Sequence, residues 1–379
     1  METALQHLTD QIRAALVAHT PLRIRGQGSK DFYGEPPHGE LLDTRSLCGI
    51  TSYEPTELVV TARAGTPLSD LEAALAEKGQ CLAFEPPRFG AAGGTCGGMV
   101  AAGLSGPARA STGGVRDYVL GLQLLNGRAE HLTFGGQVMK NVAGYDVTRL
   151  MVGSLGTLGV LTGISLKVLP VAPAEVTLVF EVAQAAALAQ LHRWGGQPLP
   201  LNASCWVRDD TAAGSPELLF VRLRGAAAAV ASAASKMLQD LPGQQLDNAQ
   251  AGADWTACRD QRLPFFTQAK AAVSEPLALW RLSLPQTAPV LDLPWAQLVE
   301  WHGGQRWLWA PASALQALRQ AASAAAGTAA IFIAASAEGM GATGRFDPLN
   351  PELRAIHQRL KAEFDPAGLF NPGRMYPDF

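Results

Sequence analysis

The stretch FGAAGGTCGGMVAAGLSG, residues 89–106, decides the fold. Most of its side chains are Gly, Ala, Ser or Thr, and none is charged. Residues this small cannot fill a core, but glycine lets a ligand lie against the main chain, and successive amides in such turns can hold an anion. A flexible linker has a similar composition. A linker does not usually embed a helix-like piece such as Met99-Val100-Ala101-Ala102 between glycines, so the stretch predicts a ligand-binding loop.

The composition excludes several classes of protein. The 379 residues are 47% hydrophobic and 17% charged, as expected for a folded enzyme-like chain of two domains. A net charge of −3 argues against a nucleic-acid binder, which would show a basic face. The five cysteines contain no Cys-x-x-Cys pair, so we expect no metal site and a reducing, cytoplasmic compartment. The sequence shows no signal peptide and no run of about 18 apolar residues that would span a membrane.

Periodicity and turn residues predict a first domain over residues 1–172. A helix over 3–18 is followed by a strand over 22–25, which runs into the turn Gly26-Gln27-Gly28-Ser29-Lys30. A strand that leads through Arg25 into such a turn is typical of a phosphate cradle, although the Walker spacing is absent. Further strands are expected over 57–63, 81–84, 119–125, 128–134 and 160–169, with a helix over 66–79, a short helix ending at 150 and a type I′ hairpin turn at Asn126-Gly127.

An Ala-rich second domain is expected over residues 173–350. Its strands are predicted over 176–182, 203–208, 218–224, 277–284, 306–310 and 328–335, and its helices over 183–194, 226–239 and 312–325. This order predicts a ferredoxin-like, antiparallel α+β layer. A last helix over 351–364 carries Leu353, Ile356, Leu360 and Phe364 on one stripe, and residues 351–379 are expected to return to the first domain.

One G-x-G-x-x-G motif occurs at residues 339–344, directly after a predicted strand. A dinucleotide fingerprint requires a helix to begin at this point. Pro348 and Pro351 delay any helix, and too little chain follows to complete a βαβ unit. We therefore expect no Rossmann-type NAD site.

Several segments resemble one family of flavoproteins. Residues 25–30 are similar to the pyrophosphate loop of the vanillyl-alcohol-oxidase-type (PCMH-type) FAD-binding domain, and residues 95–106 are similar to its second FAD loop. Its later signatures and its C-terminal tail are matched by residues 114–121, 153–160 and 364–376. The resemblance implies an α+β protein in which a two-subdomain PCMH-type FAD-binding domain is followed by the ferredoxin-like cap domain.

The resemblance also implies which residues contact FAD. They are Arg25, Gly26, Gln27, Gly28, Ser29, Lys30, Pro87, Gly90, Thr95, Cys96, Gly97, Gly98, Ala102, Gly103, Ser105, Gly106, Gly114, Asp117, Tyr118, Gly156, Thr157, Gly159, Val160 and Asn371. Amides of 26–30 would hold the pyrophosphate, and 95–106 would contact the pyrophosphate, ribityl chain and ring. Covalent attachment in the family uses a His in the first loop. Ser29 and Lys30 stand there instead, so we expect FAD to be bound non-covalently.

Residues 134–146 resemble the smaller FAD-binding subunits, the E subunits, of bacterial glycolate oxidases. Catalytic hydroxy-acid dehydrogenases of the family hold the substrate with an Arg and a Thr. This sequence has Met139 and Ala143 at those positions, and neither Met nor Ala can hold a carboxylate. Lys140 either faces the flavin, as Asn141 would, or is a solvated loop lysine. The paired metal-binding histidines of those enzymes are absent at Trp301-His302-Gly303-Gly304, so His302 is interpreted as a surface or interface residue. No catalytic residue is assigned.

The resemblance implies an FAD-binding subunit of a multi-subunit glycolate oxidase, which oxidises a 2-hydroxy acid, glycolate, to glyoxylate. Oxidation would occur on a homologous larger FAD subunit, with electrons passing to an iron–sulfur subunit, and this chain would serve assembly or electron relay. It would be cytoplasmic, would bind no nucleic acid, and would reach the inner face of the membrane only through partners. Two alternatives remain open: a self-sufficient FAD-dependent 2-hydroxy-acid dehydrogenase and an FAD-less scaffold. Trp301, Trp307 and Trp309 suit either a subunit interface or a core.

Overall fold

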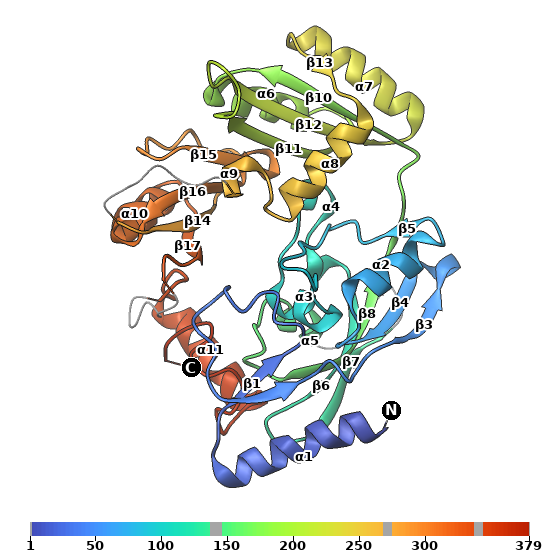
Figure 1. The fold of residues 1–379 in the computed structure, drawn as a ribbon, viewed down its shortest axis with the longest axis vertical. Coiled ribbons are helices and arrows are strands. Elements are labelled where there is room, and N and C mark those ends of the chain that lie inside the picture. Colours follow the sequence, from blue (N-terminus) through green and yellow to red (C-terminus); the bar gives the residue numbers. More distant parts are fainter. Residues whose placement is uncertain (1, 137–145, 268–274, 337–343, 379) are drawn as a thin grey trace. The chain divides into compact units, whose positions relative to one another are not determined.

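The computed structural model describes residues 2–136, 146–267, 275–336 and 344–378 (Figure 1). The chain forms two compact units: unit 1 is built from 1–104, 114–170 and 337–379, and unit 2 from 105–113 and 171–336. The sequence predicted boundaries at 172 and 350. The structure separates the units near residue 171, but it places the short segment 105–113 in unit 2 and the described residues 344–350 in unit 1.

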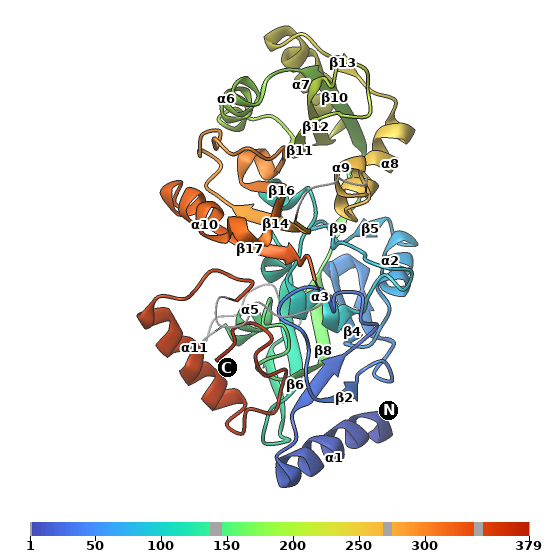
Figure 2. The ribbon, with the colours of Figure 1, turned by 60° about the vertical axis from the view of Figure 1, so that its left-hand side comes forward.

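Unit 1 begins and ends the chain, so both termini lie in it (Figure 2). Its helices are α1 (Glu2–Ala18), α2 (Leu68–Ala76), α3 (Cys96–Ala102), α5 (Val147–Met151) and α11 (Pro351–Phe364), with the 3-10 turns η1 (Pro55–Glu57) and η2 (Val115–Asp117). Its strands are β1 (Leu22–Arg25), β2 (Glu40–Asp43), β3 (Ile50–Glu54), β4 (Val59–Arg63), β5 (Gln80–Cys81), β6 (Val119–Leu125), β7 (His131–Gly135), β8 (Val160–Lys167) and β9 (Leu169–Pro170).

Two layers of unit 1 correspond to the expected subdomains. In the described residues, β1 and β2 pair in parallel, and β3-β4-β8-β6-β7 form a five-stranded antiparallel sheet. One core joins α1 to β1 and β2 through side chains such as Leu8, Ile12 and Leu42. A second core lies between α2, α3 and the larger sheet, where Leu71 and Val100 are fully buried. These cores fix the loops that follow β1 and precede α3.

The turn between β6 and β7 differs from the predicted two-residue hairpin. It spans residues 126–130, and the side-chain oxygen of Asn126 accepts hydrogen bonds at 2.9 Å from the amides of Arg128 and Glu130. Gly127 has another role, because a Cβ there would lie 2.5 Å from Oδ1 of Asp365. The glycine therefore allows the chain that follows α11 to approach this turn closely.

The predicted apolar stripe of α11 packs only in part. Phe364 is buried and Leu360 packs against the core of the larger sheet. Leu353 and Ile356 are 46% and 50% exposed, respectively. The C-terminal half of α11 therefore anchors the helix, while its N-terminal half is held by Asn350, whose side chain accepts a hydrogen bond from the Leu353 amide at 2.8 Å.

Unit 2 is built on one large antiparallel sheet. Its strands are β10 (Ala174–Glu181), β11 (Leu201–Arg208), β12 (Glu217–Gly225), β13 (Gln244–Gln245), β14 (Leu277–Ser283), β15 (Gln297–Glu300), β16 (Gln305–Pro311) and β17 (Thr328–Ile333). Its helical segments are α4 (Arg109–Thr112), α6 (Gln184–Gly195), α7 (Ala227–Asp240), α8 (Asn248–Arg259), α9 (Pro264–Thr267) and α10 (Leu315–Ala324), with η3 (Trp301–Gly303) and η4 (Ala312–Ala314).

The sheet order shows that unit 2 contains the same ferredoxin-like arrangement twice. Within the described residues the order is β13-β10-β12-β11-β15-β16-β14-β17. In each half the strands lie in the order fourth, first, third, second, and the two halves meet where β11 pairs with β15. The second half has α10 before its fourth strand, whereas none of residues 284–296 between β14 and β15 is helical. The strand order of the ferredoxin-like layer expected from the sequence thus occurs twice, and both of its helices are present in the first half.

Helices cover both faces of the first half of this sheet. Leu178 and Phe180 of β10 point into a core with α6 and α7. Thr177 of the same strand faces the opposite side and accepts a hydrogen bond at 2.9 Å from the indole of Trp255 on α8. The sequence predicted only a looser region at α8. The helix forms there because Asp247 caps its first turn and because Trp255 is buried against the sheet.

Candidate functional site

The first loop, residues 26–30, follows β1 and folds back over the side chain of Arg25. The Arg25 guanidinium donates to Oδ2 of Asp31 at 2.8 Å, and a Cβ at Gly28, where φ is +72°, would lie 2.2 Å from that guanidinium. The left-handed backbone at position 28 therefore favours glycine. In the described part of the chain, the amides of Gln27, Gly28 and Ser29 have no protein acceptor. A turn in which several backbone amides lack an acceptor in the protein is suited to hold an anion.

The first loop packs directly against the stretch that precedes α3. A Cβ at Gly26 would lie only 2.5 Å from the hydroxyl of Thr95. The amide of Gly94 donates to the side-chain oxygen of Gln27 at 2.9 Å, and a Cβ at Gly94 would lie 2.9 Å from the Ser29 hydroxyl. The two loops predicted to hold the pyrophosphate therefore lie side by side, and glycine allows the contact on both.

Helix α3 begins at Thr95, whose hydroxyl accepts a hydrogen bond from the Gly98 amide at 3.2 Å. The amides of Cys96 and Gly97 donate to carbonyls of the segment 64–66 at 2.9 and 2.7 Å. All three amides thus have acceptors within the protein. These amides are therefore already used within the protein, and residues 96–98 would have to contact a ligand through other atoms.

Cys96 lies in the flavin-loop sequence, but its thiol belongs to the core. The residue is completely buried between α3 and the larger sheet. Burial raises the pKa of this thiol to about 12. The thiol is therefore protonated at neutral pH and is a poor nucleophile.

The start of the glycine stretch combines a rigid and an open part. Pro87 is buried, whereas Gly90 is exposed, and no atom lies within 4 Å of the position that its Cβ would take. The ammonium of Lys30 lies 5.9 Å from the centre of the Phe89 ring. A positive charge therefore lies where the two loops meet, as suits an anionic ligand.

The end of α3 packs against the segment 153–159. Gly103 ends the helix with φ of +64°, and a Cβ there would lie 3.0 Å from the backbone of Gly153. The amide of Leu155 donates to the carbonyl of Ala101 at 2.8 Å, next to the buried Ala102. Two further predicted site segments are thus in backbone contact.

Asn371 connects three distant parts of unit 1. Its side-chain amide donates to the carbonyl of Leu155 at 2.7 Å, and its side-chain oxygen accepts from the amide of Ile24 at 2.9 Å. A Cβ at Gly156 would lie 2.7 Å from the same side-chain amide. Asn371 thereby fixes the strand that enters the first loop against the segment 153–159.

Several predicted site residues have structural roles for their side chains. Thr157 is buried and donates to the carbonyl of Ser154 at 2.8 Å. Val160 is fully buried in the core of α1, so only its backbone is available to a ligand. A Cβ at the neighbouring Gly159 would lie 2.9 Å from the carbonyl of Leu125, which leaves no room for a side chain.

The signature at residues 114–121 is also used for local structure. The Gly114 amide donates to a carboxylate oxygen of Asp117 at 2.9 Å and so closes the turn η2. Tyr118 is buried, with its ring centre 5.1 Å from that of Phe84.

Two predicted flavin-loop residues, Ser105 and Gly106, belong to unit 2. The indole of Trp301 donates to the carbonyl of Gly106 at 3.0 Å. Trp301 and Trp307 are buried within unit 2, which settles their alternatives in favour of a core. The predicted second flavin loop thus ends in a segment that belongs to unit 2.

The sequence analysis missed Arg374 as a residue that shapes the site. Its guanidinium donates to the carbonyls of Lys30 at 3.2 Å and Asp31 at 3.0 Å, and it also bonds the carbonyl of Glu35. Burial lowers its pKa to about 10, so the group remains charged at neutral pH. Arg374 therefore fixes the backbone at the end of the first loop.

Lys361 has a similar role behind the segment 153–159. Its buried ammonium donates to the carbonyls of Thr157 at 2.7 Å and Phe370 at 2.9 Å, and to Asp365 at 2.7 Å. Burial lowers its pKa, while the adjacent Asp365 carboxylate opposes that shift. The sequence did show that the C-terminal tail contains polar groups, but it could not show which carbonyls they meet.

Some predicted positions lie outside the described residues. They are Met139, Lys140, Asn141 and Ala143, together with residues 339–343 of the G-x-G-x-x-G motif. Among the residues that are described, no cluster of three or more His, Cys, Asp and Glu side chains could hold a metal ion. No helix in the described ranges is long and apolar enough to cross a membrane.

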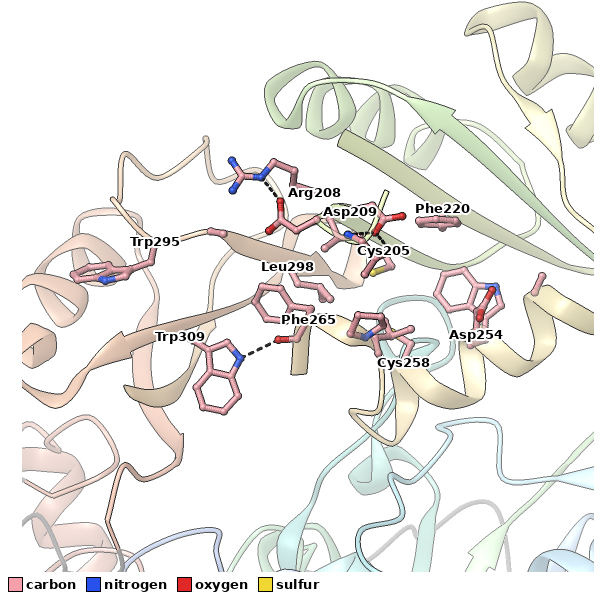
Figure 3. A pocket seen from close by; sticks show the side chains of 18 of the residues that line it. Cys205, Arg208, Asp209, Phe220, Asp254, Cys258, Phe265, Trp295, Leu298 and Trp309 are labelled. Atoms are coloured by element: carbon pink, nitrogen blue, oxygen red, sulfur yellow. Dashed lines mark hydrogen bonds and ion pairs between the residues drawn. The ribbon is translucent and has the colours of Figure 1, made fainter. Parts of the chain in front are cut away.

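Unit 2 contains a cavity of about 400 Å³ between the sheet and α8 and α9 (Figure 3). Its walls are mostly apolar and aromatic, and they include Phe220, Trp255, Phe265, Trp295, Leu298 and Trp309. Of the described side chains that line it, only Arg208 is a cation, and its guanidinium is paired with Asp210 at 2.9 Å. Asp209 and Asp254 also line the cavity. The cavity therefore does not suit a small carboxylate. The aspartates of the lining would repel its negative charge, and the arginine already pairs with another carboxylate.

Two thiols lie at the sheet side of this cavity. The Cys258 thiol donates to Oε1 of Glu300 at 3.4 Å. A hydrogen bond with Cys205, together with burial, raises the pKa of Cys258 well above its usual range. Glu300 is buried and also accepts from the indole of Trp307 at 2.6 Å. The Cys258 thiol is therefore protonated at neutral pH and donates to the buried Glu300 carboxylate.

His302, interpreted from the sequence as a surface or interface residue, is half-buried, and both nitrogens of its ring have partners within unit 2. Its Nδ1 lies 2.9 Å from the hydroxyl of Ser204, and its Nε2 lies 3.0 Å from that of Ser111. Burial lowers the pKa of His302 to about 4, so the imidazole is neutral at pH 7. The residue joins β11 to the segment 105–113 inside unit 2.

Comparison with known proteins gives these features a family. The family described as "FAD binding domain" matches residues 3–148. The "Glycolate oxidase subunit GlcE" of Escherichia coli (strain K12) is 46% identical over 373 residues, which are 98% of this chain and 97% of that protein. The "Glycolate oxidase subunit GlcD" of Bacillus subtilis (strain 168) is 32% identical over 177 residues, 45% of this chain and 37% of that protein.

A crystal structure of p-cresol methylhydroxylase with substrate bound is similar at a TM-score of 0.72 and 12% identity, covering 99% of this chain and 87% of that one. At this identity the likeness shows the fold, and it confirms the PCMH-type α+β architecture expected from the sequence. The matched FAD-binding region includes the first loop, the glycine stretch and α3. The chain therefore belongs to the family of the glycolate oxidase subunit GlcE and carries the FAD-binding domain of the PCMH-type flavoproteins.

Proposed function

We propose that this chain is the FAD-binding subunit of a heteromeric glycolate oxidase, with substrate oxidation on a homologous, larger flavoprotein subunit. The observation that carries the proposal is the likeness to GlcE over 98% of the chain. The fold adds a physical reason. Among the described residues, the amides of 27–29 in the first loop have no acceptor, and Gly26 and Gly94 let this loop pack closely against the second loop. Both features fit the pyrophosphate of FAD.

The chain would hold FAD without a covalent bond. When bound, FAD supplies two-electron redox chemistry that no side chain offers. The first loop has Ser29 and Lys30 where the family's covalent enzymes have a His. A cysteine could also form a bond to the flavin, and Cys96 lies in the predicted second flavin loop. Its thiol is protonated and buried in the core, so we expect no such bond. The amides of residues 27–29 would face the phosphates, with Lys30 adding positive charge.

The proposed role excludes substrate oxidation by this chain alone. A 2-hydroxy acid needs a cation for its carboxylate and a base for its hydroxyl proton. The cavity of unit 2 provides acidic groups and an arginine that is already paired. The imidazole of His302 is not among the groups that line this cavity, and two serines hold it through both ring nitrogens. The substitutions Met139 and Ala143 in the sequence point the same way.

Two partners follow from this division of labour. The first is a larger homologous subunit. The GlcD protein is named as a glycolate oxidase subunit, and it is longer than this chain, because the same 177 matched residues are 45% of this chain and only 37% of GlcD. The second is an iron–sulfur subunit that takes the electrons onward. The chain itself has five cysteines with no Cys-x-x-Cys spacing, so a cluster would have to reside elsewhere. In the complex, this chain would serve assembly or electron relay.

The proposal is tested on the purified chain supplied with FAD. We expect a visible flavin band that is released into the supernatant by acid precipitation and that glycolate or D-lactate does not bleach. Rapid bleaching by the isolated chain would favour a self-sufficient dehydrogenase, and absence of the band would favour a scaffold without FAD. Co-purification from cells, with partner masses and iron content measured, tests the two predicted partners.

A further inference from the structure

A strained corner in unit 2 lies directly after β15. Trp301, His302 and Gly303 follow one another with φ of +54°, +56° and +103°. Left-handed backbone is rare for a bulky residue such as Trp, and it persists only where surrounding contacts stabilise it. A Cβ at Gly303 would lie 2.9 Å from the carbonyl of Gln286, so the corner is also packed tightly. Such strain is commonly associated with a functional constraint.

The corner turns the indole of Trp301 onto the segment 105–113. Its N–H donates to the carbonyl of Gly106 at 3.0 Å, and both groups are buried. The guanidinium of Arg109 lies 4.5 Å from the centre of the indole ring and covers it. Two different interactions of one side chain, a hydrogen bond and a cation–π contact, thus fix the first turn of this segment.

The next residue, His302, fixes the second turn of the same segment. Its imidazole bridges Ser204 on β11 and Ser111 on α4 at 2.9 and 3.0 Å. Its amide also donates to the Ser204 hydroxyl at 3.0 Å. The imidazole is neutral at pH 7, so one ring nitrogen donates and the other accepts, which suits a bridge between two hydroxyls.

The held segment is continuous with the flavin-loop sequence at both ends. Leu104, the last residue of unit 1 before it, follows α3 and Gly103, and Gly114 begins the next signature. The segment includes Ser105 and Gly106, which the family resemblance places against the flavin. Trp301 and His302 therefore fix the segment in which the predicted second flavin loop ends.

We propose that Trp301 and His302 are positioning residues for FAD, which hold the segment 105–113 in the conformation that binds the flavin. The inference rests on the proposed function and extends it, because it makes two side chains outside the predicted flavin loops necessary for full flavin affinity. These side chains need not touch FAD. They act by ordering the chain before binding, so that FAD does not have to do so.

The expected effect follows from the population of the ordered segment. If a variant lowers the fraction of protein in the competent conformation, the apparent Kd for FAD rises by the same factor. Loss of one buried hydrogen bond that leaves the Gly106 carbonyl unpaired corresponds to about a 5- to 30-fold change in such an equilibrium. We therefore expect Trp301→Phe, which keeps an aromatic ring and removes the N–H, to weaken FAD binding by up to about 30-fold, the full factor being reached when the ordered form becomes the minor one.

The experiment compares Trp301→Phe with Trp206→Phe in the full chain. Trp206 is a matched control, because it is buried in unit 2 and its indole donates to a backbone carbonyl, that of Val182, at 2.9 Å. None of its described hydrogen bonds or ring contacts involves the segment 105–113. FAD titration followed by flavin fluorescence gives Kd, and amide hydrogen exchange of residues 105–113 without FAD gives the order of the segment.

The inference requires faster exchange in the segment and weaker FAD binding for Trp301→Phe, with both unchanged for Trp206→Phe. Wild-type exchange in the segment, or a wild-type Kd, would overturn it. If wild-type protein fails to bind FAD, the proposed function fails, and the exchange data still show whether the corner orders the segment. Should Trp301→Phe not fold, Ser111→Ala removes only the outer hydrogen bond of His302, and an unchanged Kd and exchange in that variant would refute the role of His302.

Discussion

Replacing Gly26 by alanine tests whether the two flavin loops pack as closely as the structure shows. The new Cβ would lie 2.5 Å from the hydroxyl and 3.1 Å from the methyl group of Thr95. Thr95 cannot move without loss, because the same hydroxyl caps α3 by accepting the Gly98 amide. The substitution should therefore disturb the first loop and the start of α3 together.

The magnitude follows from two costs. Overpacking by one methyl group costs about 1–3 kcal/mol. Displacing the hydroxyl removes a helix cap worth about 1 kcal/mol. We expect Gly26→Ala to lower the free energy of unfolding of unit 1 by about 2–4 kcal/mol. The control Gly136→Ala should change it by less than about 0.5 kcal/mol, because no atom lies within 4 Å of its Cβ position.

Calorimetric unfolding of Gly26→Ala, Thr95→Ala and the double variant measures the coupling directly. Thr95→Ala alone should cost about 1 kcal/mol through the lost cap. It also makes room for the new methyl group, so the double variant should lose at least about 1 kcal/mol less than the sum of the single variants. Additive costs within about 0.5 kcal/mol would refute the contact between the two loops.

Three further predictions concern buried groups. Lys361→Met leaves the Asp365 carboxylate buried without its ammonium, so calorimetry should show a loss of about 3–5 kcal/mol. Because the pKa of His302 is about 4 when folded and near 6.5 when unfolded, folding stability should fall as pH drops from 6.5 to 4, by up to about 3 kcal/mol, and His302→Asn should flatten that decline. Iodoacetamide at pH 8 should label the exposed Cys48 quickly and Cys96 only after unfolding, as read by mass spectrometry.

Local patterns were sufficient for the elements with strong periodicity. The strand leading into the first loop, the helix of residues 68–76 and the alternation in unit 2 were all expected. The short strand β15 was not, because Gln297 and Glu300 at its ends are polar and nevertheless buried. Glu300 is tolerated there only through donors such as Trp307, which follow later in the chain. No local rule reveals such partners.

The same limit applies to the site. The glycines at 26, 94 and 103 could be read from the sequence, because close backbone approach leaves a compositional trace. Arg374 and Lys361 leave no such trace, since their acceptors are backbone carbonyls brought together by the fold. The bridge made by His302 could not be predicted for a related reason, because the serines that hold it come from β11 and α4.

The duplicated sheet explains why the segment 105–113 is held where it is. Each half of unit 2 would end in an open strand edge at β11 or β15, and open edges are liable to pair with other chains. Pairing these edges removes the exposure and aligns Cys205 with Glu300. That register places Ser204, one residue earlier on β11, beside the corner that follows Glu300. The buried Glu300 network fixes the strand end, and the strained corner can then present Trp301 to Gly106. The segment 105–113 is therefore held beside the place where β11 and β15 join the two halves of the sheet. Hydrogen bonds from the corner after β15 fix it there.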